Sequence, residues 1–264
     1  MRFRILGSGS KGNSSLVRTS QAMYLIDNGF SGKEIVRRLE SLEINPADIQ
    51  GILVSHDHID HVRGVGIFAR RFKTPIYMTH ETYRVAKDRF KQTEIRYFNQ
   101  GDTLELGDLR VQTFALPHDA AEPVGFTLAH LNGNGRDQKL GYVTDLGQVT
   151  TLVQQQLHDV TRLVFEANHD DHLLMNGPYP WKTKQRIRGR YGHLSNEVSG
   201  KFIGELVQQN GLESVTIAHL SENNNDPILA RDTIVQTVEK ATGKTIDVSV
   251  ASQHEPAVEI IIQD

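Results

Sequence analysis

A block of histidines and aspartates that follows directly on an apolar segment constrains this chain more than any other feature. The apolar segment is Ile52-Leu53-Val54, and the block is His56-Asp57-His58-Ile59-Asp60-His61. In an extended chain, side chains two positions apart point to the same side, so the first two histidines can hold one metal ion. The last two residues of the block come where the chain turns toward a helix, and they face a neighbouring position. The motif therefore predicts a site for two divalent ions at the end of a buried strand.

Short segments rich in Val, Ile, Leu, Phe and Tyr are spread along the chain, and turn residues bound most of them, which is typical of strands. They are Arg2–Leu6, Ser15–Arg18, Met23–Asp27, Gly51–Ser55, Pro75–Thr79, Leu109–Leu116, Val124–His130, Lys139–Thr144, Thr161–Glu166, Ser214–Ala218 and Thr245–Val250. Amphipathic periodicity predicts several helices. They are Gly32–Leu42, Val65–Arg71, Glu81–Phe90, Ser195–Asn210 and Ile228–Ala241.

The order of these elements favours an α+β fold. The clearest hairpin joins the predicted strands 124–130 and 139–144 through Asn132-Gly133-Asn134-Gly135, which supplies residues that tolerate positive φ angles. No repeat, linker or low-complexity stretch divides the sequence, so we expect a single domain over residues 1–264. Two packed sheets with helices on their outer faces would use all the predicted elements.

The composition excludes several classes of protein. The chain has no cysteine, which excludes disulfides, thiolate metal ligands and a cysteine nucleophile. No run of about 18 apolar residues predicts a membrane span. The first residues lack the apolar stretch of a signal peptide, so we expect a cytoplasmic protein with no membrane partner. Because the net charge is −3, contact with nucleic acid would have to depend on a local basic patch.

Further histidines and acidic residues follow apolar segments later in the chain. His118 follows Leu116-Pro117, Asp145 follows a predicted strand, and His219 follows another. Together with the His-x-His-x-Asp-His block, this order resembles the metallo-β-lactamase superfamily. The resemblance implies an αββα sandwich of two mixed sheets. It also implies one ion held by His56, His58, His118 and Asp145, and a second held by Asp60, His61, His219 and Asp145.

The same resemblance implies a supporting aspartate and a choice of metals. Asp27, in Leu25-Ile26-Asp27, matches an early aspartate that supports the metal loop from behind. The alternative is an aspartate that caps a turn at a strand end. Imidazole and carboxylate ligands suit Zn²⁺ and Mn²⁺, and iron is possible. We therefore expect two divalent metal ions, Zn or Mn, as cofactors.

The segment Gly192-His193-Leu194-Ser195 opens a predicted helix and resembles the phosphodiesterase branch that includes tRNA 3′-processing endonucleases. That resemblance implies a catalytic His193 oriented by Glu166, with Asp60 beside them at the reacting centre. The chain as a whole resembles the YycJ/WalJ family, also in its opening Gly7–Ser14 and in Glu166-Ala167-Asn168-His169. That family implies 5′-to-3′ exonuclease activity on DNA in the cytoplasm, with a part in DNA repair.

A basic stretch precedes His193 and suggests a substrate track. Residues 181–191 contain five basic residues, no acidic one, and an aromatic residue at each end. Cations follow a phosphate backbone and aromatic rings stack on unpaired bases. The predicted nucleic-acid contacts are Trp181, Lys182, Lys184, Arg186, Arg188 and Arg190. The alternative is a solvated helix face. The loop Gly7–Ser14 could likewise offer backbone amides to a phosphate, or form only a tight turn.

The sequence favours metal-assisted hydrolysis of a phosphodiester, with a protonated His193 supporting the leaving oxygen. The choice of DNA over RNA rests on the resemblance alone. Two rival functions stay open. One is a small-molecule hydrolase of the same fold, such as a thioesterase or lactonase, which would have no use for the basic stretch. The other is a non-catalytic metal-binding regulatory module, which would be expected to have lost ligands.

Overall fold

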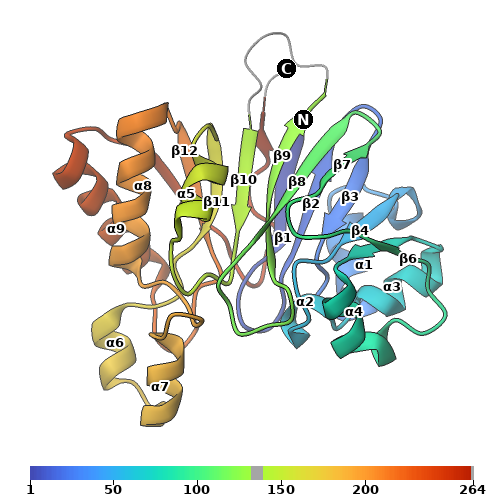
Figure 1. Ribbon diagram of the computed structural model, residues 1–264, viewed down its shortest axis with the longest axis horizontal. Coiled ribbons are helices and arrows are strands. Elements are labelled where there is room, and N and C mark those ends of the chain that lie inside the picture. Colours follow the sequence, from blue (N-terminus) through green and yellow to red (C-terminus); the bar gives the residue numbers. More distant parts are fainter. Residues whose placement is uncertain (132–138, 263–264) are drawn as a thin grey trace.

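The computed structural model describes residues 1–131 and 139–262, and these form two facing sheets with helices on both outer sides (Figure 1). The first sheet is mixed: β1, β2 and β3 are antiparallel, whereas β3 to β6 run parallel. In spatial order its strands are β14 (Ile260–Ile261), β1 (Arg2–Gly7), β2 (Ser14–Arg18), β3 (Met23–Ile26), β4 (Gly51–Leu53), β5 (Ile76–Met78) and β6 (Ile95–Tyr97).

The second sheet is also mixed. Its strands β7 to β10 are antiparallel, and β10 to β13 are parallel. In spatial order they are β13 (Asp247–Val250), β12 (Ser214–Ala218), β11 (Arg162–Glu166), β10 (Lys139–Val143), β9 (Val124–His130), β8 (Leu109–Ala115) and β7 (Thr103–Leu106). The parallel strands of both sheets bring their carboxyl ends to one edge of the sandwich, and that edge carries the site.

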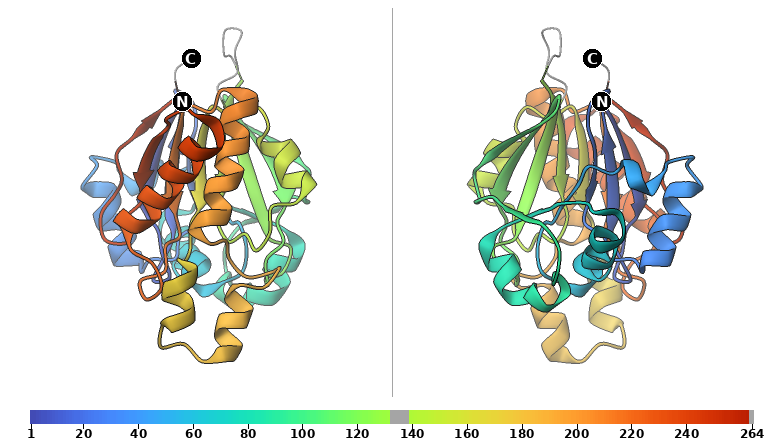
Figure 2. Two further views of the ribbon diagram at one scale, coloured as in Figure 1. Left: turned by 90° about the vertical axis from the view of Figure 1, so that its left-hand side faces the viewer. Right: turned by 90° about the vertical axis from the view of Figure 1, so that its right-hand side faces the viewer.

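Helices cover the outer faces of both sheets, and one pair projects away from them (Figures 1 and 2). The first sheet is covered by α1 (Gly32–Glu40), α3 (Val65–Phe72) and α4 (His80–Ala86), and α2 (Ile59–Val62) lies at its lower edge. The second is covered by α5 (Thr151–Leu157), α8 (Asn196–Asn210) and α9 (Pro227–Thr242). The projecting pair is α6 (Asp171–Asn176) and α7 (Trp181–Ile187). Two short 3-10 helices, Pro46–Asp48 and Lys87–Arg89, complete the elements.

Strands in the middle of each sheet are buried on both faces, which explains their unbroken apolar sequences. In β11, Val164 packs between the sheets, whereas Leu163 and Phe165 pack under the helices of the second sheet. In β4, Leu53 faces the other sheet and Ile52 faces the helices of the first sheet. Three apolar clusters result, one between the sheets and one under each helical layer.

The αββα sandwich expected from the sequence is confirmed, and the predicted strands and helices are present with bounds shifted by a few residues. β9 and β10 pair as an antiparallel hairpin, while the predicted turn at 132–135 lies outside the described residues. The helix predicted over Glu81–Phe90 is divided, because α4 ends at Ala86 and a 3-10 turn follows. The elements not predicted are α2, α5, α6, α7, β6, β7 and β14. None of the described helices is long and apolar enough to span a bilayer.

Phe126→Ala is expected to destabilise the protein by about 3–5 kcal/mol, because the fully buried ring of Phe126 fills the space between the sheets beside Phe98 and Tyr142. Chemical denaturation measures this loss. Val85→Ala on α4 serves as the control, since Val85 is 54% exposed and its truncation is expected to change the free energy of unfolding by about 0.5 kcal/mol or less. Equal stability of the two variants would contradict the described packing between the sheets.

Candidate metal centre

Four residues of the site lie within three positions of the end of a strand, and three of them have an uncommon backbone conformation. Asp27 follows β3, Asp145 lies just beyond β10, and His219 follows β12; their φ angles are 58°, 62° and 56°. For residues other than glycine this left-handed region costs on the order of 1–3 kcal/mol. Such a conformation persists where surrounding contacts fix the residue. It directs each side chain away from the course of its strand. The fourth residue, His56, comes three positions after β4.

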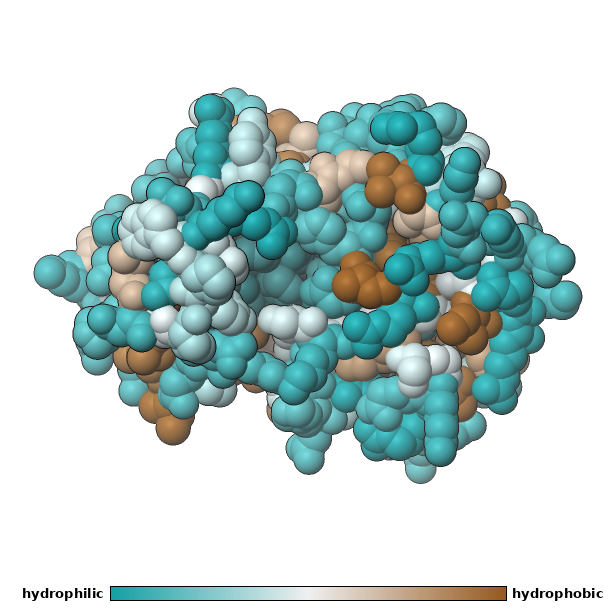
Figure 3. Space-filling model, turned by 90° about the horizontal axis from the view of Figure 1, so that it is seen from below, coloured by the Kyte–Doolittle hydropathy of each residue, from teal (hydrophilic) through white to brown (hydrophobic). Residues whose placement is uncertain are grey.

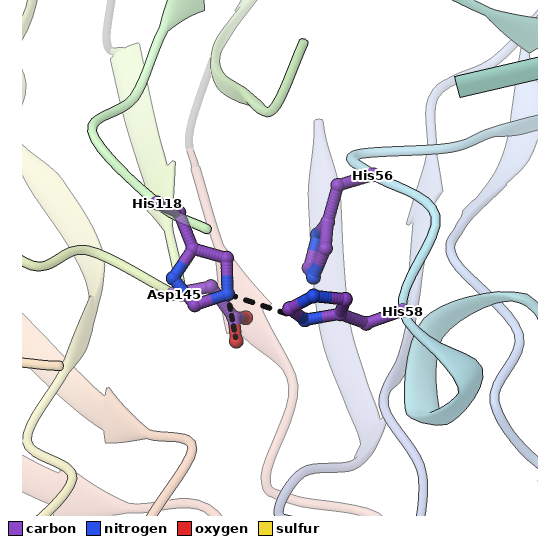
Figure 4. A group of neighbouring side chains, drawn as sticks. All are labelled: His56, His58, His118 and Asp145. Carbon is purple, nitrogen blue, oxygen red and sulfur yellow. Dashed lines mark hydrogen bonds and ion pairs between the residues drawn. The ribbon is translucent and has the colours of Figure 1, made fainter. Parts of the chain in front are cut away.

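The first group of predicted ligands converges on one point. One ligand atom from each of His56, His58, His118 and Asp145 lies within 4.8 Å of the others (Figure 4). Nε2 of His118 is 3.3 Å from Nδ1 of His58 and 3.6 Å from a carboxylate oxygen of Asp145. Nε2 of His56 is buried without any hydrogen-bond partner in the described protein. A bound cation would satisfy this buried nitrogen.

Three of these ring orientations follow from hydrogen bonds on the far side of each imidazole. Nδ1 of His56 donates to the Ser55 hydroxyl at 2.9 Å, and Nε2 of His58 donates to the Asp119 carbonyl at 3.2 Å. Nδ1 of His118 donates to the carbonyl of Gly192 at 3.1 Å. Because the outer nitrogen carries the proton in each ring, the inner nitrogen keeps its lone pair for a metal.

The second group of predicted ligands lies beside the first. Asp60, His61 and His219 also offer ligand atoms within 4.8 Å of one another. Nε2 of His219 is 3.4 Å from Asp60 and 3.5 Å from Asp145, and Nε2 of His61 is 3.1 Å from the other oxygen of Asp145. The carboxylate of Asp145 therefore stands between the two groups. The structure thus brings together every residue that the sequence predicted as a ligand.

Asp27 lies behind the metal loop, as predicted. It is fully buried, and it accepts hydrogen bonds from the Ser55 amide at 2.8 Å, the Ser55 hydroxyl at 2.7 Å and Nδ1 of His61 at 2.8 Å. Since Ser55 in turn accepts from His56, one carboxylate orients a ring in each group.

Glu166 occupies the corresponding position behind the other half of the site. Its fully buried carboxylate accepts from Nδ1 of His193 at 2.8 Å and from Nδ1 of His219 at 2.9 Å. The amides of Asp145, Leu146 and Leu194 also donate to it. Burial by itself raises the pKa of Glu166, but the two imidazoles outweigh it and hold that pKa at about 2. The predicted contact with His193 is present, and the contact with His219 was not foreseen.

The charges of the centre favour a cation. Burial alone lowers the pKa of His219, yet the carboxylates of Asp145, Asp60 and Glu166 raise it to about 10. The same balance of burial against Asp145 and Asp27 raises the pKa of His61 well above its usual value. The negative charge of these carboxylates has to be balanced. Protons on the histidines balance it in the metal-free protein, and divalent ions would replace those protons on binding. The donor set therefore fits the predicted metals.

Asn13 is a residue of the centre that the sequence did not identify. It is 1% exposed, and its amide nitrogen lies 3.2 Å from Asp60 and 3.0 Å from Nε2 of His61. Its amide oxygen accepts from the Ser8 hydroxyl, and Oγ of Ser8 in turn accepts from the His219 amide. An asparagine among glycines and serines, just ahead of a predicted strand, was the available signal in the sequence.

The loop Gly7–Ser14 is a tight turn in the structure. Its amides from Ser8, Gly9, Lys11, Gly12 and Asn13 all donate to acceptors within the protein. A phosphate cradle needs free amides, so the alternative of a cradle made from these groups is wrong. The loop instead carries Asn13 to the metal centre and Ser10 to the cleft above it.

A cleft of about 270 Å³ opens over the two groups. Seen from below, the molecule is hollowed near its middle, and hydrophilic residues line this recess (Figure 3). His58, Asp60, Asp145, His193 and His219 line it on the side of the sandwich. Tyr179, Thr183, Arg186 and Ile187 line it from α7 and the turn before α7. The predicted catalytic residue His193 therefore shares one cavity with ligands from both groups.

The predicted nucleic-acid contacts have different surroundings. Trp181, Lys182 and Arg190 are exposed, and Arg188 is exposed beside Asp171. Arg186 reaches into the cleft and pairs with Asp119 at 2.5 Å. Lys184 does not fit the prediction, because it is buried and its ammonium donates to the Met175 carbonyl at 2.7 Å. Periodicity on a short helix could not show which of its lysines faces inward.

His169 and His172 stand in the acidic stretch His169-Asp170-Asp171-His172, whose composition predicts a solvated loop. His172 is exposed as that prediction requires, although it lies in helix α6 and not in a loop, whereas His169 is only 2% exposed. Burial is the main cause that lowers the pKa of His169 to about 4. The expectation was wrong for His169, since its backbone pairs with Ser195 and Asn196 and draws the ring inside.

Comparison with known proteins places this geometry in context. A family described as the Beta-lactamase superfamily domain matches residues 23–210. Exodeoxyribonuclease YycJ of Bacillus anthracis is 34% identical over 243 residues, which cover 91% of this chain and 90% of the relative. Exodeoxyribonuclease WalJ of Streptococcus pneumoniae is 32% identical over 245 residues, which cover 91% and 89%. The solved metallo-β-lactamase fold protein YhfI from Bacillus subtilis superimposes with a TM-score of 0.71 at 13% identity, over 97% of this chain and 98% of that chain.

Asp27→Asn is expected to weaken binding of Mn²⁺ or Zn²⁺ by about 10- to 100-fold, because an amide nitrogen would face a donor where the carboxylate now accepts. Titration of metal-free protein by calorimetry measures the change. Asp88→Asn is the matched control, since the side chain of Asp88 is 78% exposed and far from the centre in sequence. An unchanged affinity in Asp27→Asn would show that the buried aspartate does not support the ligands.

Proposed function

Because the chain belongs to the β-lactamase superfamily, and within it to the group of the YycJ and WalJ proteins, we propose that it is a dinuclear-metal phosphodiesterase that digests DNA from the 5′ end in DNA repair or processing. The observation that carries the proposal is the position of His193. Its ring lies in the cleft between His118 and His219, with ring centroids at 5.1 and 5.3 Å, and Glu166 holds it from behind.

The proposed ligand sets are those predicted from the sequence. One ion, Zn²⁺ or Mn²⁺, would be held by His56, His58, His118 and Asp145. The other would be held by Asp60, His61, His219 and Asp145, which lie within reach of each other. When bound, the ions supply an activated water and neutralise charge on the phosphate.

The chain's own residues account for the other parts of the reaction. His193 is placed to protonate the leaving oxygen. The charge on its ring depends on two opposing effects, its burial and the neighbouring carboxylate of Glu166. Burial alone lowers the pKa of His193, but the carboxylate of Glu166 outweighs it, so the pKa is raised and the protonated form that a proton donor needs is favoured. Asp60, the third predicted catalytic residue, also lines the cleft, and the Asn13 amide donates to its carboxylate.

The lining of the cleft favours a phosphodiester over an acyl ester. The side chains around it are mostly polar or charged, and Ile187 is its only aliphatic residue among the described ones. Thioesterases and lactonases bind apolar acyl groups, for which sites are lined mainly by hydrophobic side chains. Arg186, in contrast, presents a guanidinium that suits a phosphate.

The central test uses metal-free protein reconstituted with Mn²⁺ or Zn²⁺ and strands of DNA and RNA labelled at either end. Wild-type protein is expected to release mononucleotides from the 5′ end of DNA. His58→Ala is expected to abolish release because it removes a ligand. His193→Ala is expected to lower kcat by roughly 10²- to 10⁴-fold because it removes the proton donor. His80→Ala is the matched control, since the His80 side chain is 69% exposed.

The outcomes separate the rival functions. A folded, metal-loaded protein that cleaves no nucleic acid would contradict the nuclease proposal and direct attention to thioester and lactone substrates. Release from the 3′ end, or from RNA alone, would correct the polarity or the substrate.

Glu166→Gln is expected to lower both kcat and metal affinity, each by about tenfold or more, because one carboxylate holds His193 and His219. A glutamine amide cannot accept from all five of the donors around it. Steady-state kinetics at saturating metal, combined with metal titration, separates the two effects. Glu197→Gln on the exposed start of α8 is the control. A variant with normal metal affinity and reduced kcat would limit the role of Glu166 to His193.

A further inference from the structure

The cleft has one wall that does not belong to the sandwich. This wall is the α6–α7 hairpin, residues 171–187, which projects below both sheets (Figures 1 and 2). It contributes Tyr179, Thr183, Arg186 and Ile187 to the lining of the cleft. Its own apolar residues, Leu174 and Ile187, are buried but belong to none of the three apolar clusters of the sandwich. The hairpin is therefore an addition at the site and contributes little to the cores of the fold.

Two polar contacts join the helices of the hairpin to each other. The buried ammonium of Lys184 on α7 donates to the Met175 carbonyl on α6 at 2.7 Å. At its base, Arg188 pairs with Asp171 at 3.1 Å. A buried lysine that is hydrogen-bonded across two helices has to be displaced before they can separate.

The hairpin is also fastened on both sides of the cleft. Arg186 pairs with Asp119, which follows the predicted ligand His118. On the other side, the Asn223 amide donates to the hydroxyl of Tyr179 at 2.8 Å, and Asn223 comes four residues after His219. The hairpin thus spans from the loop of one metal group to the loop of the other.

The basic and aromatic side chains of the hairpin suit contact with single-stranded nucleic acid. From residue 172 to residue 191 the sequence has no aspartate or glutamate and five lysines and arginines. Tyr179 lines the cleft with its ring held by Asn223, and Trp181 beyond it is 60% exposed. Rigid aromatic rings stack on bases of any sequence, and cations follow the backbone.

On these contacts, and resting on the proposed nuclease function, we propose that the α6–α7 hairpin closes one end of the cleft and makes the enzyme act on strand ends. A cleft of about 270 Å³ is small even for a site that takes one ligand molecule. A continuous strand cannot pass through it while the hairpin is fastened across it. A free end can enter, and its terminal base stacks on Tyr179 while the adjoining phosphate meets Arg186.

The test compares linear single-stranded DNA with a covalently closed circle of the same sequence. Wild-type protein is expected to digest the linear strand and leave the circle intact. A variant in which residues 172–187 are replaced by a short Gly-Ser linker is expected to nick the circle and to release longer fragments from linear DNA. The linker can close the gap because Asp171 and Arg188 are already in contact.

Two results would overturn the proposal. In the first, wild-type protein cuts circles as fast as linear strands. In the second, a folded linker variant digests linear DNA and still leaves circles intact. If wild-type protein cleaves neither form, the nuclease function itself fails, and the role of the hairpin fails with it.

If the linker variant does not fold, point variants test the proposed role of the hairpin. Tyr179→Ala is expected to lower kcat/KM on linear DNA by about 5- to 150-fold, mainly through KM, as the loss of one stacked base predicts. Tyr179→Phe keeps the ring and is expected to recover most of that loss. Tyr83→Ala, on α4 away from the cleft lining, controls for loss of an aromatic ring. A Tyr179→Ala enzyme as active as wild type overturns the proposal.

Discussion

Each of the five histidines in the two ligand groups has one ring nitrogen against a hydrogen-bonding partner on its outer side, and the direction of the other nitrogen follows from that contact. Ser55, Asp27 and Glu166 provide three of these partners, and two backbone carbonyls provide the rest. Without them, the rings would have to converge on one another while buried, with nothing to favour the required tautomers. The left-handed conformations of Asp27, Asp145 and His219 belong to the same arrangement, because they turn the side chains from the strand ends into the centre.

Glu166 links the two halves of the proposed reaction. The same carboxylate orients His219, a proposed ligand, and His193, the proposed proton donor. The spacing between the proposed ligand His219 and the proposed proton donor His193 is therefore set by a single carboxylate, which accepts from five protein donors. Asn13 has a comparable position on the other side, where it joins Asp60 to the loop that also contacts His219 through Ser8.

The α6–α7 hairpin forms one wall of the cleft, and it supplies none of the predicted metal ligands. The sandwich alone would leave the metal centre open along the edge where the strands end. The hairpin adds a cationic and aromatic side to that edge, and it is fastened to Asp119 and Asn223 on opposite sides of the centre. On the role proposed for the hairpin, the enzyme would obtain a preference for strand ends from an element that supplies neither its predicted metal ligands nor its proposed proton donor.

The sequence by itself determined the class of fold, and it predicted the candidate ligands that the structure brings together. Strands buried on both faces have unbroken apolar sequences. Metal ligands must be particular residue types at particular spacings. Both features are therefore visible in the local sequence. His56 to His61 shows this most clearly. Only the tertiary structure decided that Lys184 faces inward, that His169 is buried, that Asn13 reaches the centre and that Glu166 also holds His219. These features depend on segments far apart in the chain meeting in space, and no local periodicity or spacing records such a meeting.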